Sequence, residues 1–304
     1  MLKSIKKTQN NILIIKHGSF GDLIRSCLFI EAIKKYHKND NIILLTSKIY
    51  ESLIKKNPNI NGIEIDDRKS ILNLKYYFRL RKKLLSYKFK YIYDLQNSQR
   101  TLFYKKILLP KHKWLTTNRE KHPISGLRGL ADMLKRAQIK FNDTLKSDIS
   151  WMIYDVQKIL TKSNIKKEFI LIIPGSSKKN AYKRWPYFND LISLLLKKKF
   201  EVVTILGPEE LDLENKLSGK ILKNLSWEEV SGIIQKSRFI ISNDTGAIHI
   251  AACLNKNGLV FYGHTKNPTI AELNYKNFIS VQSDNLYELS AEKIYKNFLK
   301  DQLY

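Results

Sequence analysis

Short apolar runs, each followed by a polar or glycine-containing loop and then by residues with helical spacing, recur along the whole chain. They occur at residues 11–16, 41–46, 62–65 and 91–95, and again at residues 168–173, 201–206, 239–241 and 258–262. Such runs are typical of parallel strands that are buried on both faces, and parallel strands need long crossover connections, usually helices. The alternation therefore predicts two successive α/β sets, each with a parallel sheet covered by helices.

The length of the chain, 304 residues, is large for one domain and sufficient for two. A polar, irregular stretch at residues 142–148 separates the two sets and is the candidate linker. We therefore predict two Rossmann-like domains, at residues 1–163 and 164–304, which face each other across a cleft. The helix predicted at residues 291–299 is then placed to pack back on the first domain.

The chain is strongly basic, with 54 Lys and Arg residues against 28 Asp and Glu residues and a formal net charge of +26. A field of this size favours acidic partners, namely nucleic acid, an anionic membrane surface or phosphorylated substrates. The alternative is a solvated coat of lysines without a specific partner. The long helix predicted at residues 70–87, where basic and aromatic residues interleave, is open to the same two interpretations.

Targeting features are not apparent in the sequence. No apolar run approaches the roughly 20 residues that span a bilayer, and the run at residues 12–15 is too short for a signal peptide. The two cysteines, Cys27 and Cys253, do not make a disulfide framework. We therefore expect a reduced, cytosolic setting.

The stretch at residues 238–252 predicts an anion-binding turn. A buried strand is followed by a polar turn that includes Asp244, and a helix begins near Thr245. The first turn of a helix presents free N–H groups and the positive end of the helix dipole, and Gly246 lets a ligand approach the backbone closely. His249, one turn further along, can face the same ligand. The alternative is an ordinary strand–turn–helix crossover that Asp244 caps.

Polar side chains also follow two other strands of the second set. They are Ser176 and Ser177 after the first strand, the nearby cations Lys183 and Arg184, and Glu209 and Glu210 after the second strand. Ligands of open parallel sheets bind at the carboxyl ends of the strands. Hydroxyl groups, a helix N-terminus and fixed cations together predict a diphosphate site, and a neighbouring carboxylate can accept hydrogen bonds from ribose hydroxyl groups.

In the first set, Asp22 follows the first strand behind a loop that contains Gly18 and Gly21. A carboxylate there can take the proton of an acceptor hydroxyl while a nucleotide diphosphate leaves. The alternative is that Asp22 only caps the following helix, predicted at residues 23–36. No metal-binding motif is present in the sequence, so the positive groups of the second set would stabilise the leaving diphosphate.

Four motifs, in this order, resemble those of glycosyltransferase family 9, the ADP-heptose heptosyltransferases of lipopolysaccharide synthesis. They are KHGSFGDLIRS at residues 16–26, PGSS at 174–177, KRWP at 183–186 and SNDTGAIHIAA at 242–252. The resemblance covers most of the chain and implies the two-domain GT-B fold and an inverting reaction that requires no metal or other cofactor. It also implies roles for particular residues: Asp22 as the catalytic base, Ser176, Ser177 and Lys183 on the donor diphosphate, Asp244, Thr245, Gly246 and His249 in the nucleotide-sugar loop, and Glu209 or Glu210 on the donor ribose.

The resemblance further implies an ADP-sugar donor that carries a heptose-like sugar, an acidic lipid-linked saccharide as acceptor, and a location on the inner face of the inner membrane. The first domain would then bind the acceptor and the second the donor. Plausible acceptor contacts are Lys16, Gln96, Asn97, Arg100, Arg119 and His122. The sequence departs from the family pattern at residues 178–182, which lengthen the loop between PGSS and KRWP.

A second function stays open at this point, a non-catalytic basic module that binds nucleic acid or an anionic membrane on the same scaffold. The net charge and the basic helix favour it. A module of this kind has no need of Asp22, Lys183, Asp244 and His249 together, so the transferase interpretation is preferred and no nucleic-acid partner is expected.

Overall fold

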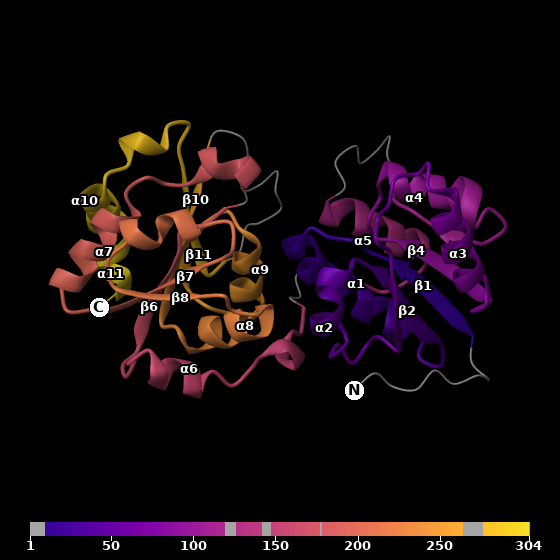
Figure 1. Ribbon diagram of the computed structural model, residues 1–304, viewed down its shortest axis with the longest axis horizontal. Helices are drawn as coiled ribbons and strands as arrows, with labels where there is room; N and C mark the ends of the chain where they lie inside the picture. Colours follow the sequence, from indigo (N-terminus) through magenta and orange to yellow (C-terminus); the bar gives the residue numbers. More distant parts are fainter. Residues whose placement is uncertain (1–9, 119–125, 142–146, 177, 264–275, 304) are drawn as a thin grey trace. The chain divides into compact units, whose positions relative to one another are not determined.

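Each half of the chain folds around one parallel β-sheet with helices packed on it, as the sequence predicts (Figure 1). The computed structural model describes residues 10–118, 126–141, 147–176, 178–263 and 276–303. The chain divides into two units, Met1–Trp151 and Met152–Tyr304. Within the described residues, no helix combines the length and the apolar character needed to cross a membrane.

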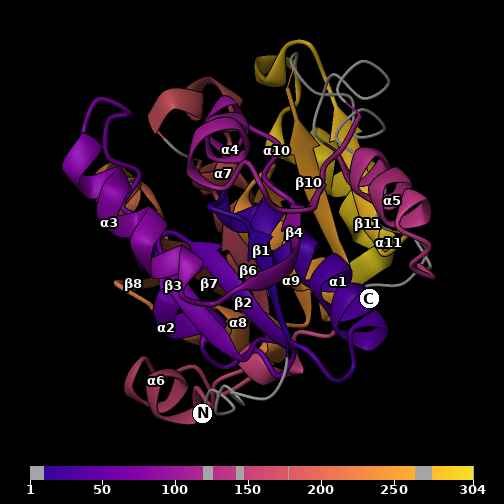
Figure 2. The same cartoon turned by 90° about the vertical axis from the view of Figure 1, so that its right-hand side faces the viewer.

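The sheet of the first unit has the strand order β3-β2-β1-β4-β5, and all its strands are parallel (Figure 2). Its elements are β1 (Asn11–Ile15), α1 (Phe20–Tyr36), β2 (Asn41–Thr46), α2 (Glu51–Ile54), β3 (Gly62–Ile65), α3 (Leu74–Leu85), β4 (Phe89–Asp94), α4 (Gln99–Phe103), β5 (Trp114–Leu115) and α5 (Leu127–Arg136). In the register of β1 and β2, Ile14 lies opposite Leu44. Four residues of β1 and all six of β2 are buried, which explains their uninterrupted apolar character.

The sheet of the second unit has the order β11-β10-β9-β6-β7-β8 and is also parallel throughout. Its elements are α6 (Gln157–Lys162), β6 (Phe169–Ile173), α7 (Phe188–Lys197), β7 (Glu201–Leu206), β8 (Lys220–Lys223), α8 (Trp227–Lys236), β9 (Phe239–Asn243), α9 (Gly246–Cys253), β10 (Gly258–Tyr262), β11 (Phe278–Gln282), α10 (Ala291–Ile294) and α11 (Lys300–Leu303). A 3₁₀ helix at Lys178–Lys183 precedes α7. In the register of β6 and β9, Leu171 lies opposite Ile240.

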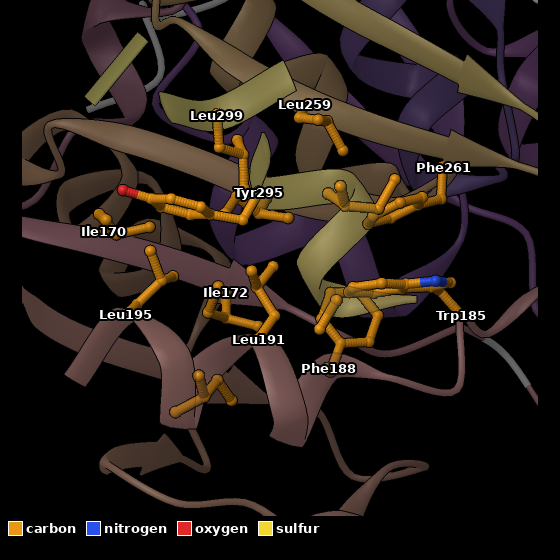
Figure 3. Close-up of a cluster of buried hydrophobic side chains, with 14 of the residues drawn as sticks. Ile170, Ile172, Trp185, Phe188, Leu191, Leu195, Leu259, Phe261, Tyr295 and Leu299 are labelled. Atoms are coloured by element: carbon orange, nitrogen blue, oxygen red, sulfur yellow. The ribbon is translucent and has the colours of Figure 1, made fainter. Parts of the chain in front are cut away.

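The core of the second unit lies between β6, β9 and β10 on one side and α7 with the C-terminal helices on the other (Figure 3). Ile172 of β6 packs with Leu191 of α7, and the ring of Trp185 stacks on Phe261 with 4.2 Å between centroids. Leu299 belongs to the same cluster. The terminal helices therefore contribute to the core of the second unit.

The second unit begins earlier in the sequence than the domain boundary predicted after residue 163. The Oγ of Ser231 on α8 donates to the carbonyl of Met152 at 2.7 Å. A Cβ on Gly232 would lie 2.2 Å from the carbonyl oxygen of Tyr154, so only glycine permits this approach. These contacts attach the segment before α6 to the second unit.

Candidate functional site

Each sheet has a point where the strand order reverses. In the first unit β1 lies between β2 and β4, and in the second unit β6 lies between β7 and β9. At such a point, the connections from two neighbouring strands run to opposite sides of the sheet, which leaves a crevice between the loops. Ligands of open α/β sheets bind in this crevice, outside the carboxyl ends of the strands. The loops that follow β1, β4, β6 and β9 carry most of the residues that the sequence predicts as a site.

The loop after β1 is held by the loop after β4. The backbone N–H groups of His17 and Gly18 both donate to Oε1 of Gln96, at 2.9 and 3.3 Å. Gly18 has a φ of +137°, and a Cβ there would lie 3.1 Å from the ring of Tyr50. Glycine is therefore required at this position, and the side chain of Gln96 holds the loop that leads into α1.

Asp22 lies in the first turn of α1, which begins at Phe20, earlier than predicted. The helix is capped at Ser19, so Asp22 is not the N-cap. Its Oδ2 accepts a hydrogen bond from Ser19 Oγ at 3.1 Å, and its Oδ1 lies 3.7 Å from Nη1 of Arg25. The Asp22 side chain is 48% exposed. A carboxylate that is oriented by two neighbours and still open to solvent can accept a proton from a substrate.

Lys16, a predicted acceptor contact, is buried and sends its Nζ to the carbonyl of Leu95 at 3.4 Å. Burial lowers the pKa of the Lys16 ammonium, while the nearby Asp22 carboxylate raises it. Lys16 thus lies beneath the loop, in the electrostatic field of Asp22. Asn97 is likewise part of the loop after β4, where its N–H donates to Asp94 Oδ1 at 2.8 Å.

A buried polar network, which the sequence did not suggest, lies beside this loop. Nε2 of His17 is 2.9 Å from Oδ2 of Asp66, at the end of β3, and both side chains are almost fully buried. Tyr104 donates to the same carboxylate oxygen, and Tyr76 donates to Oδ1 at 2.8 Å. Burial alone would raise the pKa of Asp66, but the hydrogen bonds from His17 and Tyr104 outweigh it and hold that pKa well below its usual range. Asp66 therefore stays ionised. Its carboxylate connects the loop after β1, through His17, with α3, through Tyr76, and with the helical segment after α4, through Tyr104.

Arg100, another predicted acceptor contact, lines a cavity of about 430 Å³ in the first unit. The lining residues are Ser47, Lys48, Ile49, Asp66, Asp67, Arg68 and Arg100. The Arg100 guanidinium donates to the carbonyl of Lys69 at 2.9 Å and to that of Arg68 at 3.2 Å. The cavity thus brings together three cations: Lys48 at the start of the 3₁₀ helix Lys48–Tyr50, Arg68 in the segment before α3, and Arg100 in α4. The sequence had not indicated Lys48 or Arg68.

In the second unit, the segments after β6 and β9 meet through a buried ion pair. Nζ of Lys183 lies 3.4 Å from Oδ2 of Asp244, and the two side chains are 9% and 14% exposed. Asn243, at the end of β9, accepts from the N–H of Trp185 at 3.0 Å and donates to the carbonyl of Pro174 at 2.6 Å. The KRWP and NDTG motifs are therefore joined by direct hydrogen bonds, although they lie far apart in the sequence.

Arg184 connects the loops that follow β6 and β7 at the carboxyl ends of the strands. Its guanidinium donates to the carbonyls of Ser176, at 2.9 Å, and Glu209, at 3.3 Å. A cavity of about 410 Å³ lies beside it, lined by Ala181, Arg184, Pro208, Glu209, Leu211 and Asp212. The carboxyl of Glu210 instead packs against the backbone at Gly175 and Gly207. A Cβ on Gly175 would lie 2.5 Å from its Cδ, and one on Gly207 would lie 2.4 Å from its Oε2, so the two glycines leave the room that this carboxyl occupies. Burial raises the pKa of the Glu210 carboxyl.

The N-terminus of α9 lies at the carboxyl end of β9, next to the ion pair of Lys183 and Asp244. Thr245 is the N-cap, in extended conformation, and its side chain makes no capping hydrogen bond. Among the described residues, Oγ1 of Thr245 is buried without a hydrogen-bond partner. Gly246 is the first residue of α9, and His249 follows one turn later and is buried. An unsatisfied hydroxyl at an open helix N-terminus is suited to an anionic ligand.

Three predicted site residues, Ser177, Arg119 and His122, lie outside the described residues. Of the others, Asp22, Lys16, Gln96, Asn97 and Arg100 lie at the edge of the first sheet. Ser176, Lys183, Glu209, Glu210, Asp244, Thr245, Gly246 and His249 lie at the edge of the second.

Comparison with known proteins gives consistent matches. Residues 131–299 match the model of glycosyltransferase family 9 (heptosyltransferase). Lipopolysaccharide heptosyltransferase 1 of Campylobacter coli is 23% identical over 291 residues, which cover 84% of each chain. A family 9 glycosyltransferase from Veillonella parvula has a TM-score of 0.75 at 17% identity and covers 99% of this chain and 93% of its own. E. coli heptosyltransferase WaaC, solved with ADP-2-deoxy-2-fluoro heptose, has a TM-score of 0.72 at 16% identity, with 96% and 99% covered. The two-unit α/β fold is therefore that of the GT-B heptosyltransferases.

Proposed function

This chain belongs to glycosyltransferase family 9, the heptosyltransferases, and from that premise we propose that it transfers a heptose-like sugar from an ADP-sugar to a lipopolysaccharide core acceptor, with inversion at the anomeric carbon. The observation that carries the proposal is the half-exposed, oriented carboxylate of Asp22 at the strand-order reversal of the first sheet. A second carboxylate in the same surroundings, Asp66, is buried and engaged in hydrogen bonds. Asp22 is therefore the better base.

In the proposed reaction, an acceptor hydroxyl oxygen attacks the anomeric carbon of the donor sugar as the bond from that carbon to the diphosphate oxygen breaks. The hydroxyl proton passes to the Asp22 carboxylate. The bonding electron pair leaves with ADP, whose negative charge is stabilised by Lys183 and by the N–H groups at the start of α9. The fixed positive groups serve this step, so the proposal assigns no metal ion.

The donor assignment rests on the second unit. Lys183, the α9 N-terminus and the Thr245 hydroxyl, which has no hydrogen-bond partner among the described residues, suit a diphosphate. Glu209 lines the cavity beside Arg184, where a carboxylate can accept from a ribose hydroxyl. The similar E. coli heptosyltransferase WaaC was solved with ADP and with ADP-2-deoxy-2-fluoro heptose, which supports adenine as the base. In the first unit, Lys48, Arg68 and Arg100 line a cavity together with Asp66 and Asp67, so that the cavity suits both the acidic groups and the hydroxyl groups of a saccharide. We also propose a location at the cytoplasmic face of the inner membrane, where such lipid-linked acceptors are accessible.

Two measurements test this function. Calorimetric titration with ADP, GDP and UDP should give selective binding of ADP. Replacement Asp22→Asn should lower the transfer rate by about 10²–10⁴-fold while ADP affinity stays unchanged, because a general base contributes that much and lies outside the donor unit. Glu31→Gln, which changes a carboxylate further along α1, is the control. Transfer by Asp22→Asn at the wild-type rate would rule out the base, and RNA binding without any nucleotide binding would favour the basic module.

A further inference from the structure

Four exposed apolar side chains gather at one place in the first unit that the transfer reaction does not use. Ile71, Leu72, Leu74 and Phe78 have exposed fractions of 52%, 83%, 75% and 69%. Ile71 and Leu72 belong to the turn before α3, and Leu74 and Phe78 belong to its first half. Single exposed apolar residues are ordinary, but several large ones in so short a stretch mark an interaction surface. We call these four residues the α3 surface.

The helix itself separates this surface from the core. Tyr77, Leu80 and Leu84 face inward and belong to the hydrophobic cluster of the first unit. Leu74 and Phe78 are four positions apart, so they lie one above the other on a different, exposed side of the helix. The helical repeat therefore places Leu74 and Phe78 outside the face that packs on the core, so the core does not need them.

The turn before α3 is anchored, so its apolar residues are held outward. The Arg100 guanidinium and the Tyr77 hydroxyl both donate to the carbonyl of Lys69, at 2.9 and 2.8 Å. The side chain of Asn73 caps α3 by accepting from the N–H of Tyr76, and its own N–H donates to the carbonyl of Ser70 at 2.9 Å. A turn fixed at both ends presents its apolar side chains at little further cost in conformational entropy.

The charged residues of α3 and of the turn before it are all cations. From Arg68 to Lys90 the sequence contains nine Lys or Arg residues and no Asp or Glu. Lys75, Arg79 and Lys82 are exposed and lie along the solvent side of the helix. Cations alone would suit nucleic acid, whose backbone binding is electrostatic. Large apolar side chains among the cations instead suit an anionic lipid surface, which offers both phosphate groups and an apolar layer beneath them.

We propose that the α3 surface docks the protein on an anionic bilayer, with its four apolar side chains inserted at the headgroup level and the neighbouring cations on lipid phosphates. The inference deepens the membrane location given under the proposed function and rests on it. It assigns that location to an amphipathic element of the first unit, the unit that also carries the candidate acceptor cavity.

Sedimentation of the full chain with vesicles tests the proposal. Wild-type protein should bind vesicles of phosphatidylcholine with about 30% phosphatidylglycerol and should not bind phosphatidylcholine alone. The double replacement Leu72→Ser and Phe78→Ser should lower the partition coefficient about tenfold or more, because two apolar side chains no longer leave water. Tyr287→Ser is the matched control, since Tyr287 is 72% exposed in the second unit. It should bind vesicles as the wild type does.

Several results would overturn the docking surface. Equal vesicle binding by the double variant and the wild type would do so, as would no binding of anionic vesicles by the wild type. If the wild type is a dimer and the double variant is a monomer, the surface binds a second copy of the chain. If Lys75→Gln alone abolishes RNA binding, the surface binds nucleic acid. ADP titration of each variant keeps the two proposals apart, because the donor site lies in the other unit.

Discussion

Nζ of Lys183 lies 3.4 Å from Oδ2 of Asp244, so the cation assigned to the donor diphosphate already has one buried counter-ion. The pair joins the segments that follow β6 and β9, and it holds the ammonium at the carboxyl edge of the sheet. A bound diphosphate would add charge-assisted hydrogen bonds to a group whose position is fixed in advance.

Lys183→Ala should therefore lower ADP affinity by about 10- to 100-fold, the range expected for the loss of a charge-assisted hydrogen bond. Lys197→Ala removes an exposed lysine from α7 in the same unit and should leave ADP affinity unchanged. Calorimetric titration of both variants measures the difference. Equal affinities would place the diphosphate elsewhere.

The two adjacent carboxylates after β7 should differ in their effect on the donor. Glu209 lines the cavity beside Arg184, whereas Glu210 is folded against Gly175 and Gly207. We therefore expect Glu209→Gln to weaken ADP by about tenfold and to weaken 2′-deoxy-ADP much less, because the lost contact is to a ribose hydroxyl. Glu210→Gln is the paired control, and it should weaken both nucleotides equally or neither. The opposite pattern would assign the ribose to Glu210.

Removal of the buried Asp66 carboxylate should destabilise the protein in a pH-dependent way. Its pKa is held below its usual range, so its contribution is present above the unfolded-state pKa, about 3.9, and is lost as the pH falls through the lower folded-state value. Asp66→Asn should cost about 3–5 kcal/mol at pH 7, because it leaves the His17 and Tyr104 donors poorly matched. The difference from wild type should shrink below about pH 4.

Urea unfolding of wild type and Asp66→Asn at several pH values measures this. Asp40→Asn, on a less buried carboxylate that contacts His37, is a useful comparison within the same unit. A difference that does not change between pH 7 and about pH 2 would show that the ionised carboxylate is not the stabilising form.

The sequence predicted the strands that are mostly buried, because strands buried on both faces are apolar throughout. Residues 41–46 are a clear example, since all six are buried in β2. The apolar runs did not reveal β8 or β11, which are only partly buried. The strand β5 has only two residues, so no pattern could reveal it. The helix predicted at residues 70–87 begins later, at Leu74, because Asn73 caps it and the preceding residues form a turn. Local hydrogen bonds of this kind set helix ends and are hard to read from periodicity.

The position of Asp244 to His249 at the carboxyl end of a strand could be predicted, because a single motif contains the strand end, the turn and the start of the helix. The partners of this motif could not be predicted, because they arrive through tertiary contact. Nothing near Asn243 in the sequence indicates that its side chain joins Trp185 to Pro174. Likewise, the pairing of His17 with Asp66 depends on the neighbouring positions of β1, β2 and β3 in the sheet.

Trp185 connects the core of the second unit to the donor edge, two residues after Lys183. Its ring is buried and stacks on Phe261 (Figure 3). Its Nε1 donates to the carbonyl of Leu289 at 2.8 Å, and its backbone N–H donates to the side chain of Asn243. Trp185→Ala should cost about 3–5 kcal/mol of unfolding free energy through the cavity it leaves.

Trp185→Phe should cost less, about 1–3 kcal/mol, because a ring still fills the space and the main loss is the hydrogen bond to Leu289. Its ADP affinity should stay within about threefold of wild type, since the N–H bond to Asn243 involves the backbone and still positions Lys183. Urea unfolding and calorimetric titration of both variants separate the two effects. If Trp185→Phe kept its stability but lost ADP binding, the indole itself would have to contact the nucleotide, and its role as a buried support would be wrong.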